Sequence, residues 1–167
     1  MNKLYLSCFL LLVGIPVLAQ ETTAPIFNKS NRIIFHFKDT TGLFTQLANA
    51  LMDLGYDIEM KDRELGILRT KPSTLPGSYS FNHLLEVKTI FKDSTITFAG
   101  VAYERDFLRE PESRYEVLFT RRRETIVDRS WNAMLQMGEK LQPAYISYST
   151  VTSTVPLRKV ETYRRNN

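Results

Sequence analysis

Apolar residues in this chain follow two different periods, and the order of those periods along the sequence limits the fold. Strand-like alternation of apolar and polar residues occurs over residues 32–38, 56–61, 67–70, 83–91, 95–103 and 115–119. Helix-like spacing of three and four occurs over residues 39–55 and 122–141. The order predicts an α+β fold, with an antiparallel sheet of about five to six strands and two helices packed on one face.

The ends of the first helix have their own signals. Asp39, Thr40 and Thr41 offer side-chain oxygens for an N-cap, and Gly55 stands where a left-handed residue would end the helix. The sequence therefore predicts a helix that begins just after Thr41 and stops at Gly55.

A change of parity marks the strand around residue 100. Ile96 and Phe98 are the large residues before Gly100, whereas Val101 and Tyr103, on the opposite parity, follow it. We expect a bulge or a bend near this glycine.

The chain reads as one domain with an additional segment at each end. The expected division is residues 1–19 as a signal peptide, 20–30 as a linker, 31–142 as a single α+β domain, and 143–167 as a tail or an edge strand. The edge strand, if formed, falls around residues 145–151. Cutting the signal leaves about 150 residues, which is enough for one hydrophobic core.

The first residues have the layout of a secretory signal. Lys3 precedes an apolar run over Leu4–Leu18, and the small residue Ala19 follows. The run is too short to span a bilayer comfortably, and no later segment is apolar enough to act as a membrane anchor. We expect an exported chain, cut near Ala19 and located in the periplasm or outside the cell, with no transmembrane segment after cleavage.

Charge and cysteine content narrow the chemistry of the released chain. The formal net charge is +4 for the whole chain and +3 once Lys3 is removed with the signal, a small excess that argues against a nucleic-acid partner. The single cysteine, Cys8, lies inside the signal, so the released chain has no disulfide and no thiolate ligand for a metal.

The sequence contains no recognisable catalytic motif. The two histidines, His36 and His83, lack the spacing of a metal site, and no Gly-x-Ser-x-Gly elbow or glycine-rich phosphate loop is present. We therefore expect no catalytic residues, no metal and no cofactor.

Two candidates for a binding site remain. Arg121, Arg122 and Arg123 form the densest positive run, at a strand-to-helix junction, and could bind an anionic lipid headgroup, a polyanionic glycan or an acidic partner. A solvated junction is the simpler interpretation of this run. His36 alternates with core residues and is expected on the open face of the sheet, among side chains of both charges.

Three consecutive segments resemble a recurrent module of envelope proteins. They are LANAL (Leu47–Leu51), LGYDI (Leu54–Ile58) and DRELGILRT (Asp62–Thr70). The pattern, which extends over about residues 31–141, resembles small exported domains of unknown function with a TATA-binding-protein-like fold. It is also similar to the helix-grip domains of outer-membrane assembly lipoproteins. The resemblance implies a fold and an envelope setting, and it carries no catalytic residue.

Two functions fit these observations. The favoured one is a non-catalytic exported envelope domain that binds a protein partner or supports an envelope complex. The alternative is a hydrolase or a binder of small ligands or glycans, with a site on predicted loops at residues 71–82 and 104–113.

Overall fold

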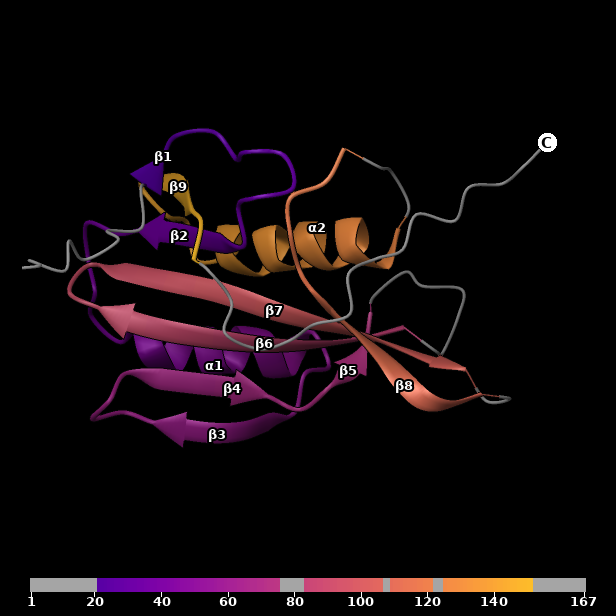
Figure 1. Ribbon diagram of the computed structural model, residues 1–167. Coiled ribbons are helices and arrows are strands. Elements are labelled where there is room, and N and C mark those ends of the chain that lie inside the picture. Colours follow the sequence, from indigo (N-terminus) through magenta and orange to yellow (C-terminus); the bar gives the residue numbers. More distant parts are fainter. Residues whose placement is uncertain (1–20, 76–82, 107–108, 122–124, 152–167) are drawn as a thin grey trace, which may run out of the picture.

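The computed structural model describes residues 21–75, 83–106, 109–121 and 125–151 (Figure 1). These residues form an α+β fold with one open antiparallel sheet of nine strands and two helices. The strands are β1 (Glu21–Thr22), β2 (Arg32–His36), β3 (Ile58–Asp62), β4 (Ile67–Thr70), β5 (Ser73–Thr74), β6 (His83–Lys92), β7 (Thr95–Asp106), β8 (Arg109–Glu116) and β9 (Tyr145–Ser149). The helices are α1 (Leu43–Asp53) and α2 (Ile126–Glu139).

The strand order is β1-β9-β2-β7-β6-β4-β3, with β5 paired to β6 and β8 paired to β7. Both helices lie behind the sheet in Figure 1 and leave its other side uncovered by helix within the described residues. On the helix side, the fully buried side chains of the strands include Phe35, Leu85, Val87, Ile96 and Phe98. This side is the hydrophobic core, whose apolar burial is the main stabilising contribution to the fold. We call the opposite side the outer face.

The described residues form nine strands, rather than the five to six that periodicity predicts. The additional strands β1 and β5 have two residues each, too short for any alternation to show. β1 falls within residues 20–30, predicted to be a linker, and pairs with β9. β9 pairs with β2 along all five of its residues and with β1 only at Tyr148 and Ser149, so it is flanked on both sides only over those two residues. Residues 152–167 lie outside the described part of the chain.

The predicted end of α1 is confirmed, and its predicted N-cap is wrong. Gly55 has φ +83°, its N–H donates to the Met52 carbonyl (2.9 Å), and the Tyr56 N–H donates to the Leu51 carbonyl (2.9 Å). These two bonds define a Schellman cap. At the other end the N-cap is Gly42, because the Asp39 carboxylate accepts from the N–H of Thr41 instead of from the helix.

Of the two predicted alternatives at Gly100, a bulge or a bend, the bulge is wrong, because β7 pairs with β6 in one register from Thr95 to Glu104. The core side of β7 is occupied in turn by Ile96, Phe98, Gly100 and Ala102. Helix α2 packs closely against β7 at Gly100. A Cβ on Gly100 would lie 2.8 Å from the Met134 sulfur. The sequence therefore changes from large to small residues on one face, which imitates a change of parity.

Candidate functional site

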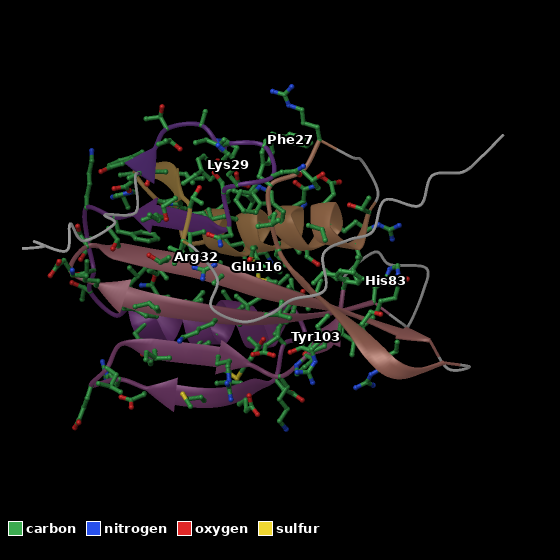
Figure 2. All side chains as sticks on the ribbon, viewed as in Figure 1. Phe27, Lys29, Arg32, His83, Tyr103 and Glu116 are labelled. Atoms are coloured by element: carbon green, nitrogen blue, oxygen red, sulfur yellow. The ribbon has the colours of Figure 1, made fainter. Side chains whose placement is uncertain are left out.

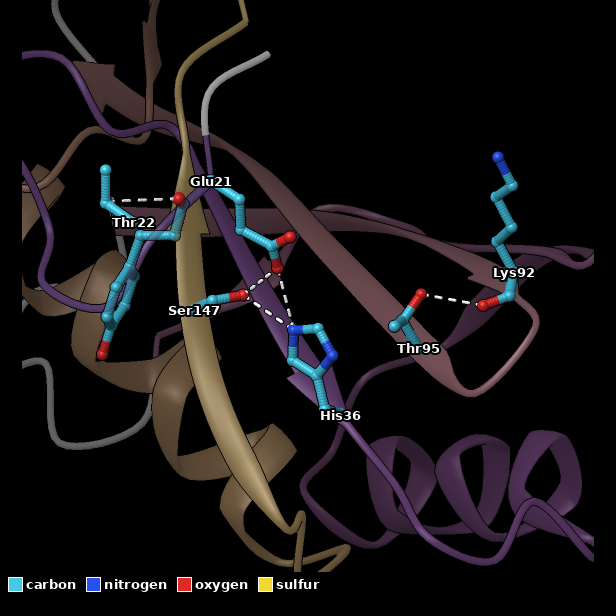
Figure 3. Close-up of polar contacts among 7 residues, drawn as sticks. Glu21, Thr22, His36, Lys92, Thr95 and Ser147 are labelled. Carbon is cyan, nitrogen blue, oxygen red and sulfur yellow. Dashed lines mark hydrogen bonds and ion pairs between the residues drawn. The ribbon is translucent and has the colours of Figure 1, made fainter. Parts of the chain in front are cut away.

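His36 does lie on the outer face, where it joins a polar cluster at the β1 end of the sheet. Its Nε2 lies 2.9 Å from Glu21 Oε1 and 2.8 Å from Ser147 Oγ, while its ring stacks on Tyr145 with centroids 3.9 Å apart. Figure 3 shows β1, β2 and β9 each contributing one of the three hydrogen-bonded side chains. We call Glu21, His36, Tyr145 and Ser147 the edge cluster.

The edge cluster contains a serine, a histidine and a carboxylate, but not in the arrangement of a catalytic triad. In a triad the base accepts the serine proton on one ring nitrogen and binds the carboxylate with the other. Here the Ser147 hydroxyl donates to Glu21, and His36 meets both partners through the same Nε2. The geometry therefore holds a carboxylate and does not activate the serine.

Glu21 is held in its charged form by this environment. Its pKa lies below the ordinary value, chiefly because Ser147 donates a hydrogen bond, with a smaller lowering from the hydrogen bond and charge of His36; partial burial opposes both. The Glu21 side chain is still 47% exposed, so the carboxylate sits at the rim of the cluster. Ser147, by contrast, is only 3% exposed and is the buried member of the edge cluster.

Arg121, the described residue of the arginine run, is not part of the edge cluster. Arg121 is exposed, with its guanidinium carbon 5.8 Å from the ring centroid of Phe27, which Figure 2 shows beyond the far end of β2. Arg122 and Arg123 lie outside the described residues. Because Phe119 donates its N–H to Ser30, this segment adjoins the beginning of β2, whereas His36 ends that strand. Arg121 and His36 thus lie toward opposite ends of β2.

A second polar cluster occupies the middle of the outer face. Arg69 pairs with Glu59 (2.9 Å) and reaches Glu86 at 3.9 Å. The Tyr103 hydroxyl also donates to Glu86, and the Arg114 guanidinium lies over the Tyr103 ring at 5.3 Å. Alternation alone predicts Glu59 and Glu86 on this face, but the pairing depends on the strand register and has no signal in the sequence.

Apolar side chains are exposed beside these charges. Met60 is 44% exposed and Ile90 42% exposed, and Ile90 lies opposite Ile67 in the β4–β6 pairing. Alternation predicts Met60 on the same side as Ile58, but a bulge between these residues places it opposite Arg69 instead. The outer face therefore combines apolar and charged side chains.

A buried asparagine ties three segments together near the start of β2. The Asn31 amide donates to Glu116 (2.7 Å) and to the Val151 carbonyl (2.6 Å), and its oxygen accepts from the Val151 N–H (2.9 Å). Arg32 and Glu116 lie side by side in Figure 2, 3.6 Å apart, and burial lowers the pKa of Arg32. Sequence reasoning missed this contact because Asn31 follows a polar stretch that resembles a linker.

The two loops predicted for an alternative active site are not both loops. Residues 104–106 belong to β7 and residues 109–113 to β8, so most of the predicted charged loop is a strand hairpin. Figure 1 shows this hairpin at the end of the sheet, beyond the helices, where no buried face imposes alternation. In the other segment, Ser73–Thr74 form β5, and residues 76–82 lie outside the described part.

Neither metal ligands, nor a membrane-spanning helix, nor similarity to other proteins identifies a function within the described residues. Within the described residues, no group of three or more histidine or acidic side chains is arranged to hold a metal ion. Neither helix of the described part has the length and apolar character needed to cross a membrane. No family model matches the chain, and neither a curated protein nor a solved structure matches it. The resemblance to TATA-binding-protein-like or helix-grip domains stays a prediction.

Proposed function

We propose that this chain is a non-catalytic exported domain of the cell envelope that binds a protein partner. The observation that supports it best is the outer face, which neither helix covers and which exposes Met60 and Ile90 alongside charged side chains. Exposed apolar side chains with polar and charged neighbours are typical of protein-binding surfaces. The hydrogen bonding of Ser147 and His36, unsuited to nucleophilic catalysis, agrees with a binding role.

The envelope setting is a separate part of the proposal. It is supported by the signal-like layout of residues 1–19. Sequencing the N-terminus of the protein recovered from cells tests it. A chain that begins near Gln20 is the expected result, whereas an intact Met1 or a lipid on Cys8 would contradict release by cleavage.

Cross-linking in intact cells tests the binding role. A photo-reactive residue at Ile90 samples the outer face, and one at Met52, which is 52% exposed on α1, serves as a matched control. We expect a discrete cross-linked protein from position 90 and none from position 52. Equal products from both positions would contradict a binding surface on the outer face.

A hydrolase assay is the complementary test. The purified protein is incubated with cell-wall and glycan substrates, beside the variants His36→Ala and Glu104→Gln. We expect no turnover by any of the three proteins. Turnover that is lost in either variant would replace the binding proposal with the hydrolase alternative.

A further inference from the structure

The strand β9 has one side only partly occupied. β2 pairs with all five of its residues, but on the other side β1 pairs only with Tyr148 and Ser149. Within the described residues, no strand pairs with Tyr145–Ser147 on that side. Unpaired strand edges present backbone donors and acceptors that an extended segment of another chain can use.

β1 itself shows which ligand this edge accepts. It is an extended segment whose carboxylate, from Glu21, is bound by Ser147 and His36 (Figure 3). Both side chains are preorganised: Ser147 is 3% exposed, and the His36 ring stacks on Tyr145. The β9 edge thus offers backbone groups for strand pairing, together with one binding position for the carboxylate of an acidic side chain.

We propose that the β9 edge binds an extended segment of a protein partner, with an acidic side chain of that segment seated on His36 and Ser147 in place of Glu21. The inference rests on the proposed function and names the site and the chemistry of the partner. The partner adds a strand along β9, including the positions Tyr145–Ser147 that β1 leaves unpaired.

The opposite end of the sheet does not fit this kind of partner. β3 is the last strand there, and a bulge between Ile58 and Met60 interrupts its pairing with β4. Three of its five residues are charged, namely Glu59, Lys61 and Asp62. Bulges and charged side chains are the usual protection of an edge strand against strand addition. The β9 edge instead has two side chains, His36 and Ser147, that bind a carboxylate.

β1 is short enough to be replaced. It has two residues, and its side chains form hydrogen bonds to the rest of the sheet through Glu21 and through the Thr22 hydroxyl, which donates to the Tyr148 carbonyl over 3.3 Å. A partner strand that spans all of β9 forms more backbone hydrogen bonds than β1 does. Cleavage near Ala19, part of the proposed function, would leave β1 at the start of the released chain.

Peptide binding to the full released chain tests the inference. The probe is a fluorescent peptide that copies residues 20–30, beside a twin in which glutamine replaces its glutamate. In the chain variant Glu21→Gln, the intramolecular competitor is weakened. We expect that variant to bind the acidic probe about tenfold tighter than the unmodified chain does, because one charge-assisted hydrogen bond has about that effect.

Three results locate the binding and decide the outcome. We expect the Glu21→Gln variant to bind the acidic peptide about tenfold tighter than it binds the glutamine peptide. We expect the double variant Glu21→Gln/Ser147→Ala to bind the two peptides equally. Amide shifts are expected in β9 and not in β3. Equal binding of the two peptides, or no binding to the Glu21→Gln variant, would overturn the inference.

The same experiments separate this inference from the proposed function. Cross-linking from Ile90 together with failed peptide binding would reject the β9 edge alone. A concentration-dependent dimer that forms without peptide, and that Ser147→Ala abolishes, would identify a second copy of this chain as the occupant and overturn the partner assignment.

Discussion

The two faces of the sheet are built on different principles. The helix-covered face is a continuous apolar layer in which Phe35, Phe98 and Trp131 are buried, and it contributes most of the stability. The outer face consists of ion pairs, hydrogen-bonded clusters and exposed apolar side chains. Exposed ion pairs contribute little stability, so this face has greater freedom to serve binding. Substitutions on the two faces should therefore separate stability from binding.

The largest effect is expected from removing the central aromatic side chain of the covered face. Trp131 is almost fully buried between Phe119 and Tyr148, with ring centroids 5.8 and 5.9 Å away. Trp131→Ala should lower the free energy of unfolding by about 3–5 kcal/mol, because it leaves a large cavity. Urea unfolding followed by circular dichroism measures it. Met52→Ala, on the exposed side of α1, should change stability by less than about 0.5 kcal/mol.

The second largest effect is expected at Gly138, where the close packing of α2 on the covered face leaves no room for a side chain. A Cβ on Gly138 of α2 would lie 2.1 Å from the Phe35 ring. Gly→Ala in a helix ordinarily stabilises by about 1 kcal/mol, but here we expect Gly138→Ala to destabilise by about 1–3 kcal/mol. The same unfolding measurement applies. When Phe35 is first replaced by leucine, Gly138→Ala should destabilise the chain less. A Gly138→Ala chain that is more stable than the original would contradict the close packing of α2 on β2.

A buried polar residue immediately before β2 should have an intermediate effect. Asn31→Ala removes the hydrogen bonds to Glu116 and to both backbone groups of Val151. We expect a loss of about 1–2 kcal/mol, because buried polar groups are left unpaired. Asn49→Ala, at an exposed position of α1, is the matched control. If both variants unfold at the same urea concentration, the Asn31 contacts do not contribute to stability.

Sequence patterns predict the covered face much better than the outer one. The apolar stripe of α2 and the Gly55 cap of α1 follow from local spacing and backbone preference, and both are observed. The edge cluster is different, since Glu21 and Ser147 are 126 positions apart and meet only through the register of β1 on β9. No local signal encodes that register. Alternation therefore predicts His36 on the outer face but none of the partners that it has in the edge cluster.

The smallest effect is expected from the charge of Glu21. Its pKa is lowered mainly by the hydrogen bond from Ser147, with His36 as the titratable group in contact. A carboxyl whose pKa is lower in the folded state adds stability above its unfolded pKa, and that stability is lost as the pH falls through the folded value. The free energy of unfolding should therefore drop more between pH 6 and about pH 3 in the original chain than in Glu21→Gln.

Urea unfolding at the two pH values measures this difference. Asp39, whose pKa is lowered by the Thr41 N–H, is present in both chains, so its contribution cancels in the comparison. Ser147→Ala should reproduce the reduced acid sensitivity, because it removes the same hydrogen bond. If neither variant changes the pH dependence, the edge cluster does not hold Glu21 in its charged form, and the outer face would lose its one seat specific for a carboxylate.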